Sequence, residues 1–266
     1  MDGVKHIVAV ASGKGGVGKS TVTVNLALAL SAQGYRVGVL DADIYGPSQA
    51  QMLGVKEGVR PQASGDNKFL PLEAHGLQAM SMAFMVNTRE AMVWRGPMVV
   101  GAFQQMLTQT QWDNLDFLLI DMPPGTGDIQ LTLAQKVPVS GAVIVTTPQD
   151  IALLDARKGI EMFRKVNVPV LGVVENMSLY HCENCGHEAA IFGTGGGDRI
   201  AEEYETTVLG RLPLTLSIRE LADSGRPSVI SEPDSPVSHT FAAIAKQVAQ
   251  SVSASHSGGP TISFSE

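Results

Sequence analysis

The feature that most constrains the fold of this chain is a glycine-rich loop close to its N-terminus. Residues 13–20 read GKGGVGKS and match the pattern G-x-x-x-x-G-K-[ST] at every fixed position. The loop follows an apolar run typical of a buried strand at residues 6–11, and it precedes apolar residues at helical spacing over 20–32. Glycines allow the backbone N–H groups of such a loop to turn towards an anion, and the following helix adds the positive end of its dipole. The sequence therefore predicts a phosphate-binding loop between a strand and a helix.

Strand and helix patterns alternate along the rest of the chain. An alternating order of this kind predicts an α/β fold, with a mostly parallel sheet and helices on both faces. The apolar runs that predict buried strands, and then the stretches with helical spacing, are residues 36–40, 117–120, 142–146, 170–174 and 207–209, followed by 151–165 and 237–252.

The predicted organisation is a single domain over residues 1–252. Residues 45–113 are less regular and are interpreted as an insertion, with a small hairpin near 59–77 and a helix over 97–111. Residues 253–266 are rich in Ser and Gly and are expected to form a disordered tail.

The bulk composition argues against several classes of partner. The formal net charge is −7, from 19 Lys and Arg residues against 26 Asp and Glu residues, with the two signs interspersed. A non-specific nucleic-acid binder usually shows a basic face, so no nucleic-acid partner is expected. The sequence contains neither a signal-peptide pattern nor an apolar run of membrane-spanning length, which favours a cytoplasmic protein without a membrane partner.

Two residues of the loop have specific roles in sites of this kind. The Lys19 ammonium is expected to reach the β- and γ-phosphates, and the Ser20 hydroxyl is expected to ligate Mg²⁺.

Asn176 offers an amide donor and acceptor that suit an adenine edge, and Pro213 would pack on the face of the base, although each residue also suits a plain turn. The predicted nucleotide-binding residues are Gly13, Lys14, Gly15, Gly16, Val17, Gly18, Lys19, Ser20, Thr21, Asn176 and Pro213.

Lys14 is a second lysine inside the loop and has no role in the basic phosphate cradle. The form K-G-G-x-G-K-[ST] resembles the deviant Walker A loop of one subclass of P-loop nucleoside triphosphatases. In that subclass the extra lysine reaches across a dimer interface to the phosphates of the partner, where it neutralises charge that develops in the transition state. We expect this role for Lys14, and the plainer alternative is a solvated lysine near an anion.

Acidic residues follow two of the predicted strands. In open α/β sheets, ligands bind at the carboxyl ends of the strands, so these side chains are expected near the loop. By resemblance to the same subclass, Asp43 is expected to position or activate the attacking water, and Asp41 to lie near the metal or to orient Lys19. Asp121 stands where a Mg²⁺-binding carboxylate belongs. The predicted catalytic residues are Lys14, Lys19 and Asp43, and the predicted magnesium ligands are Ser20 and Asp121.

The turn after Asp121 reads PPGTGD at residues 123–128. Its two prolines prevent a helix and fix the turn. Gly125 or Gly127 is then expected to bring a backbone N–H to the γ-phosphate, in an arrangement that moves when this phosphate leaves.

The chain has two cysteines, Cys182 and Cys185, within a segment expected to be a metal-binding loop at about 178–190. A thioredoxin-like redox pair needs a helix N-terminus, whereas polar neighbours indicate a loop here. A zinc site needs four ligands, and His181 and His187 would complete it only in a tight space. An iron–sulfur cluster usually takes four thiolates, which two chains would supply across a two-fold axis. The residues alone leave a shared cluster and a shared zinc ion both open.

Together these motifs resemble the Mrp/ApbC family of iron–sulfur cluster carrier proteins over nearly the whole chain. The resemblance implies a homodimeric ATPase that binds ATP and magnesium and holds a 4Fe-4S cluster between the cysteine pairs of two chains. It also implies delivery to apo iron–sulfur proteins and contact with cluster-assembly scaffold proteins. Many members carry an additional small N-terminal domain, whereas this chain begins almost at its first strand. The matching segments are residues 13–20, 40–48 (LDADIYGPS), 94–98 (WRGPM), 121–128 and 182–185 (CENC).

Two other functions stay open from the residues. The first is a spatial-organising ATPase, like the deviant-loop proteins of cell division and plasmid partition. A basic amphipathic C-terminal helix would support this function, but residues 250–266 are polar and not basic. A zinc-stabilised nucleotide switch that acts through protein partners would differ from the carrier in its metal content.

Overall fold

The computed structural model describes residues 3–65, 67–85, 95–182 and 184–256. Its centre is an eight-stranded sheet in the order β10-β7-β6-β1-β5-β2-β4-β3. Every neighbouring pair in this sheet is parallel except β3 with β4. The α/β class expected from the alternating pattern is therefore confirmed. The strands are β1 (Val4–Ala11), β2 (Val37–Asp41), β3 (Leu72–Ala74), β4 (Leu77–Ser81), β5 (Leu115–Asp121), β6 (Gly141–Thr146), β7 (Val170–Glu175) and β10 (Val208–Arg211).

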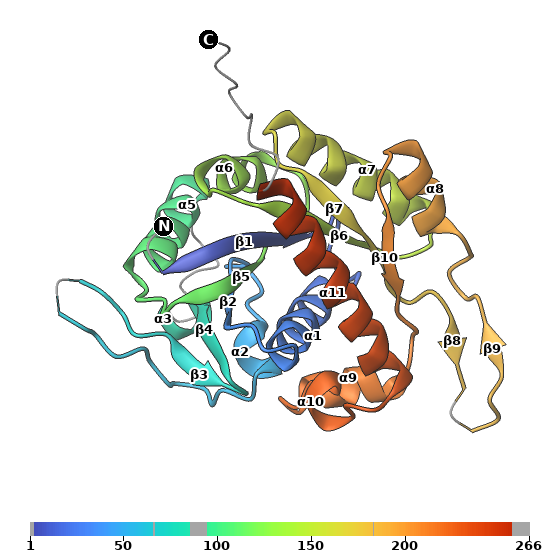
Figure 1. The fold of residues 1–266 in the computed structure, drawn as a ribbon, viewed down its shortest axis with the longest axis horizontal. Helices are drawn as coiled ribbons and strands as arrows, with labels where there is room; N and C mark the ends of the chain where they lie inside the picture. The colour runs from blue at the N-terminus through green and yellow to red at the C-terminus, as the bar shows by residue number, and fades with distance from the viewer. Residues whose placement is uncertain (1–2, 66, 86–94, 183, 257–266) are drawn as a thin grey trace, which may run out of the picture.

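Helices cover both faces of the sheet (Figure 1). The helices α1 (Lys19–Ala32) and α11 (Pro236–His256) lie side by side on one face, and α5 (Gly96–Gln109), α6 (Asp128–Lys136) and α7 (Asp150–Lys165) cover the other. Because strands covered on both faces bury every side chain, β2 and β6 are apolar and buried nearly throughout. The shorter helices are α2 (Gln49–Met52), α3 (Met82–Met85), α8 (Gly196–Glu203), α9 (Leu216–Asp223) and α10 (Ser228–Ser231).

The strand register gathers the acidic residues at one edge of the sheet. Asp41, the last residue of β2, lies beside Asp121, the last residue of β5, and Val10 of β1 lies on the other side of Asp121. The loop between β1 and α1 begins at this same edge, because it follows the end of β1 directly. The sheet therefore brings the predicted phosphate loop and the carboxylates together.

The segment interpreted as an insertion contains antiparallel pairing within the expected 59–77, where Ala63 pairs with Phe69. A second hairpin, of β3 and β4, is joined at His75 and Gly76 and extends beyond that range. His75 and Gly76 both have positive φ, at 51° and 78°, which suits a tight two-residue turn. β4 also pairs in parallel with β2, so this segment extends the main sheet.

The C-terminal end of the chain also differs from the expectation. The predicted tail starts at residue 253, but α11 continues to His256 because the buried side chains of Ala249 and Val252 hold its last turns against the core. Residues 257–266, and Trp94 of the matching segment 94–98, lie outside the described residues.

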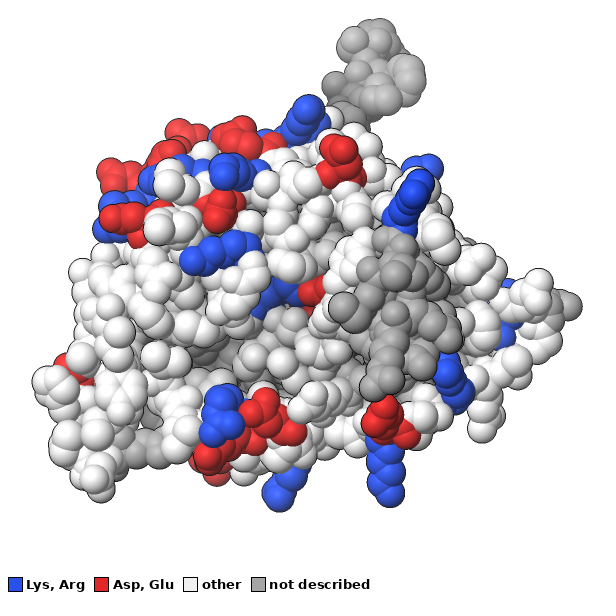
Figure 2. All heavy atoms as spheres, turned by 180° about the vertical axis from the view of Figure 1, so that it is seen from behind, with Lys and Arg blue, Asp and Glu red and all other residues white. Residues whose placement is uncertain are grey.

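Charged side chains of both signs gather over α7 and α8 on the face seen from behind, and much of the rest of that face is uncharged (Figure 2). Arg157 on α7 pairs with Glu203 on α8, with 2.8 Å between the guanidinium Nε and the carboxylate Oε2. Among the described residues, no helix is both long enough and apolar enough to cross a membrane.

Candidate functional site

The glycine-rich loop adopts the conformation that its sequence predicts. Gly16 and Gly18 have φ values of 81° and 84°, in the left-handed region that favours glycine, and α1 begins immediately after Gly18. A Cβ atom at Gly18 would lie 2.2 Å from Nδ2 of Asn176, and one at Gly13 would lie 2.0 Å from the carbonyl oxygen of Asp155. The loop is therefore packed tightly between the end of β7 and helix α7.

Lys19, Ser20 and Asp121 come together as expected. The Lys19 ammonium lies 2.6 Å from Oδ1 of Asp121 and 3.3 Å from the Ser20 hydroxyl. The Lys19–Asp121 pair is buried, with side chains 6% and 0% exposed. Sequence reasoning missed two residues here: Thr23 donates a 3.1 Å hydrogen bond to Oδ1 of Asp121, and Gln49 donates a 2.9 Å hydrogen bond to Oδ2.

These oxygens fit a magnesium ion. Mg²⁺ prefers oxygen ligands and keeps several waters, so a hydroxyl, a carboxylate and a nearby acceptor for metal-bound water suit it. The Gln49 amide nitrogen bonds both Asp121 and the Ser20 carbonyl oxygen, and its Oε1 is buried without a hydrogen-bond partner among the described residues. Ser20 and Asp121 would hold the ion, and Gln49 Oε1 would accept a hydrogen bond from its water shell.

Asp41 organises the segment that carries Asp43. Its Oδ2 accepts hydrogen bonds from the backbone N–H groups of Ser48 and Gln49 and from the Ser81 hydroxyl, at 3.0, 3.1 and 3.1 Å. Its Oδ1 accepts a hydrogen bond from the N–H of Asp43 at 3.1 Å. Burial first, and then the neighbouring Asp121 charge, raise the pKa of Asp41 to about 7.

Asp43 lies half-buried at the rim of the site. Its Oδ1 accepts a hydrogen bond from the Gly46 N–H at 3.2 Å. Burial is the largest cause that raises the pKa of Asp43, and the Lys19 charge acts in the opposite direction. A carboxylate with a raised pKa is a better proton acceptor at neutral pH, which suits the expected role towards an attacking water.

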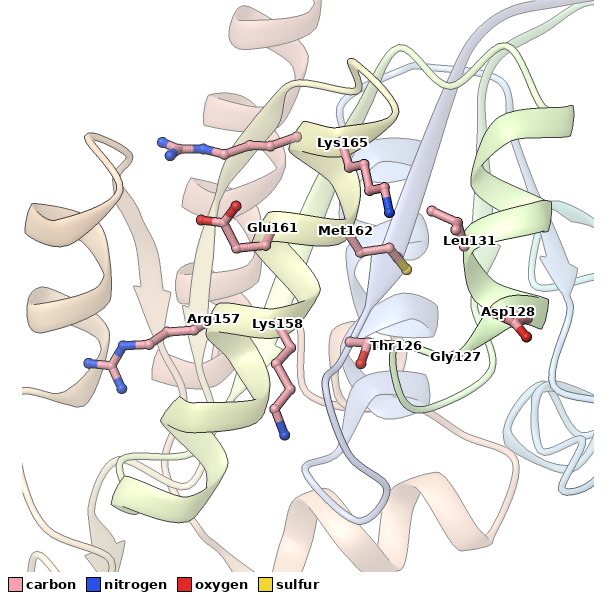
Figure 3. Close-up of a pocket in the computed structure, with 10 residues that line it drawn as sticks. Thr126, Gly127, Asp128, Leu131, Arg157, Lys158, Glu161, Met162 and Lys165 are labelled. Atoms are coloured by element: carbon pink, nitrogen blue, oxygen red, sulfur yellow. The ribbon is translucent and has the colours of Figure 1, made fainter.

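The turn after β5 contacts the phosphate loop directly. The Gly125 N–H donates to the Ser12 carbonyl oxygen at 3.0 Å, so the backbone N–H of Gly125 is bound to the loop itself. Gly127 immediately precedes α6. Residues 126–128 then form one side of a groove between α6 and α7, into which Lys158 and Lys165 extend (Figure 3).

Lys14 is half-buried in the loop, and its carbonyl oxygen accepts a hydrogen bond from the Ser12 hydroxyl at 2.8 Å. Within the described part of the chain, the Lys14 side chain forms no ion pair.

Of the two residues expected at the base, Asn176 reaches the phosphate loop. Its Nδ2 donates a 2.8 Å hydrogen bond to the Val17 carbonyl oxygen, and its side chain is 9% exposed. Pro213 lies beyond β10, in a groove that Leu179 and His181 also line. Contact of either residue with a base stays a prediction.

The two cysteines lie at the end of a hairpin that projects from the body of the molecule (Figure 1). Its strands are β8 (Tyr180–His181) and β9 (Glu188–Ala189). The Cys182 N–H donates to the His187 carbonyl oxygen at 3.0 Å, and the Gly186 N–H donates to the Cys182 carbonyl oxygen at 2.8 Å. Cys182 is partly exposed and Cys185 is exposed. Hydrogen bonds from the backbone N–H groups of Cys185 and Asn184 lower the pKa of the Cys182 thiol, which favours the thiolate form that metals bind.

The described residues leave out Glu183, and among them no three His, Cys, Asp or Glu side chains are grouped closely enough to hold a metal ion. His181 instead faces Glu188, with 3.7 Å between Nδ1 and Oε1. A four-coordinate site at the two thiols would therefore need ligands from outside these residues.

The fold and the loop geometry define the class of this protein as a P-loop nucleoside triphosphatase. A nucleotide-binding protein of Archaeoglobus fulgidus in complex with ADP superimposes with a TM-score of 0.77, at 37% identity, over 90% of this chain and 92% of that chain. The cell division ATPase MinD of Pyrococcus furiosus shares the fold, with a TM-score of 0.71 at 23% identity over 92% of this chain and 98% of that chain.

Residues 3–249 match the family model described as "ParA: NUBPL iron-transfer P-loop NTPase", and the chain belongs to this family. A protein of Pseudomonas fragi named iron-sulfur cluster carrier protein is 64% identical over 91% of this chain and 84% of its own length. The iron-sulfur cluster transfer protein NUBPL of Mus musculus is 51% identical over 96% of this chain and 80% of its own length. The resemblance to the Mrp/ApbC carriers, drawn from the motifs, is thereby confirmed.

Proposed function

We propose that the chain binds and hydrolyses ATP with Mg²⁺ and carries a 4Fe-4S cluster, held across a homodimer, to apo iron–sulfur proteins in the cytoplasm. The relatives named as cluster carriers support the cargo. The ADP-bound relative supports the nucleotide. The observation that carries the proposal is the placement of the only two thiols of the chain on a projecting hairpin, where no three His, Cys, Asp or Glu side chains among the described residues are grouped closely enough to hold a metal ion.

Different residues of the site have different roles in ATP hydrolysis. The loop N–H groups and Lys19 bind the phosphates, while Ser20 and Asp121 hold Mg²⁺, which would neutralise charge on the phosphate oxygens. Asp43 takes the proton of the attacking water, and its raised pKa suits this role. Lys14 stabilises the transition state in the partner chain, which is consistent with the absence of an ion pair at its side chain among the described residues.

The cluster is the cargo of this protein. Two chains bring Cys182 and Cys185 twice, which supplies the four thiolates that a cluster usually takes. Both thiols are accessible at the surface of the chain. Scaffold proteins would therefore transfer a cluster to this hairpin, and apo-proteins would receive the cluster from it.

The test is anaerobic reconstitution with iron and sulfide, followed by metal and sulfide analysis. We expect about four irons and four sulfides per dimer. Cys182→Ala and Cys185→Ala should lose both and keep the fold, since neither thiol is buried in the core. His187→Ala is the matched control, because it changes the same hairpin without removing a thiolate and should retain the cluster.

Two results would refute the cluster proposal. Stoichiometric iron and sulfide in Cys182→Ala would show that the thiols do not hold the cargo. About one zinc per dimer and no iron would instead define a nucleotide switch with a structural metal.

A further inference from the structure

Six residues connect the end of β7, which lies beside the phosphate loop, to the first cysteine. Residues 176–181, here called the arm, run from the end of β7 to Cys182. The arm therefore leads directly from residues beside the phosphate loop to the thiol hairpin, and its contacts at each end decide whether it transmits a displacement.

The near end of the arm is attached to the phosphate loop by two neighbouring side chains. Asn176 donates its 2.8 Å hydrogen bond to the carbonyl oxygen of Val17. The Met177 side chain also lies at the loop, since its Cε would be 3.9 Å from a Cβ placed on Gly18. A movement of the loop backbone at residues 17–18 would therefore reach both side chains.

Met177 itself has an unusual backbone. Its φ is 56°, in the left-handed region that non-glycine residues adopt rarely and at an energetic cost. Such a conformation persists where the surroundings hold it, and here the loop lies on one side and the paired arm on the other. Met177 thus stands at the joint between the two.

The end of β7 is held on its other side by the contacts of Glu175. The Glu175 side chain is 2% exposed; its Oε2 accepts a hydrogen bond from the Gly197 N–H, and its Oε1 lies 3.6 Å from the Arg211 guanidinium. The Glu175 carbonyl oxygen accepts a hydrogen bond from the Leu212 N–H at 2.9 Å. The strand end is therefore anchored to α8 and β10.

The far part of the arm is stiffened by pairing with residues 212–214. The Ser178 N–H donates to the Leu212 carbonyl oxygen at 2.9 Å, and the Leu214 N–H donates to the Leu179 carbonyl oxygen at 2.8 Å. Tyr180 continues this pairing as a parallel bridge to Leu214 and also pairs with Ala189 in the hairpin. The arm thus enters the thiol hairpin as a hydrogen-bonded strand.

We propose that the arm couples the phosphate loop to the thiol hairpin within a single chain, with Asn176 and Met177 as positioning residues, so that nucleotide binding changes the hydrogen bonds that the Cys182 and Gly186 amides form in the hairpin. This coupling rests on the proposed function, because it supplies the route by which nucleotide regulates the cluster site. It needs no movement of one chain against another.

Hydrogen exchange of the full chain, with and without Mg·ADP, tests the coupling. The amide N–H groups of Cys182 and Gly186 are hydrogen-bonded within the hairpin and report its opening. We expect Mg·ADP to change their exchange rates by about fivefold or more, the lower end of typical coupling between two sites.

Met177→Gly is the decisive variant, because glycine adopts a positive φ freely and lacks the side chain that contacts the loop. It should bind ADP with little change in affinity and should lose the nucleotide-dependent change in the hairpin. Asn167→Gly is the matched control: Asn167 also has a positive φ, 57°, but it precedes β7 and lies outside the arm. This control should keep the full response.

The outcomes separate the coupling from the proposed function. If ADP binds to the unaltered chain and the hairpin amides do not respond, the coupling is refuted while the nucleotide site stands. A full response of the hairpin amides in Met177→Gly would refute the role of Met177 in the coupling. Failure of ADP to bind to the unaltered chain would refute the nucleotide assignment itself.

Discussion

Gly18→Ala is expected to destabilise the folded chain in two separable ways. The first is backbone strain, because Gly18 has a φ of 84° and an alanine in the left-handed region costs about 1–2 kcal/mol. The second is a collision, because the new methyl group would lie 2.2 Å from Nδ2 of Asn176. Asn176 must then move away from the Val17 carbonyl oxygen, and a lost hydrogen bond of this kind costs about 1 kcal/mol or more. The total is about 3 kcal/mol.

A matched glycine isolates the backbone part. Gly16 has a φ of 81°, and a Cβ placed there meets no atom within 4 Å, so Gly16→Ala should show the strain alone, about 1–2 kcal/mol. Asn176→Ala should cost about 1–2 kcal/mol through the same hydrogen bond. In the double variant Gly18→Ala/Asn176→Ala the collision is absent, so the two effects should fall short of additivity by about 1–2 kcal/mol.

The assay is urea-induced unfolding of each variant without nucleotide, at one protein concentration and followed by circular dichroism. Equal destabilisation by Gly16→Ala and Gly18→Ala would refute the reasoning. So would additivity of the Gly18 and Asn176 changes within about 0.5 kcal/mol, since sites without a shared contact behave in that way.

Three further predictions concern charged residues of the site. Lys19→Met should abolish ATP turnover and lower the free energy of unfolding by about 3 kcal/mol, because Asp121 would stay buried without its cation; unchanged turnover would contradict the phosphate-loop assignment. Lys14→Ala should lower ATP turnover by about 10²-fold or more with a much smaller effect on ATP affinity in equilibrium binding, and an equal loss of both would argue against action in the partner chain. Without metal or nucleotide, the free energy of unfolding should fall as pH rises from about 4 to about 7. Asp41 has a pKa of about 7 in the folded chain against an ordinary value of 3.8, so the folded chain binds this proton more tightly than the unfolded chain does. This decrease, at most about 4 kcal/mol, should flatten in Asp41→Asn, and a decrease of the same size in the variant would exclude Asp41 as its source.

The parts of the site that were predictable from sequence depend on short-range rules. The phosphate loop needs glycines and a lysine at fixed spacing between a strand and a helix, so its residues and its conformation follow from one segment. Asp121 was predictable because the carboxyl ends of parallel strands meet at one edge of a sheet. The register of β2 with β5, which the sequence analysis did not predict, brings Asp41 beside it.

Gln49 was missed because it comes from a segment distant from the loop, whereas Thr23 lies on α1 itself, four residues after Lys19. Gln49 reaches Ser20 and Asp121 from α2, a four-residue helix that is too short to show helical periodicity in the sequence. The thiol hairpin is equally hard to recognise, because β8 and β9 have two residues each.

The position of β1 in the sheet has a consequence for the folding of this protein during its synthesis on the ribosome. β1 is synthesised before both of its neighbours in the sheet, β5 and β6, and its first pair joins Val4 to Leu115. At the usual speed of translation, roughly 5–20 residues per second, the apolar strand therefore waits several seconds for a partner. During this interval nucleotide cannot assist folding, because Asp121 and Asn176 have not yet emerged to complete the loop's surroundings. The nascent chain thus presents an exposed apolar strand that favours capture by chaperones, and the first part of the site to be made is among the last to become ordered.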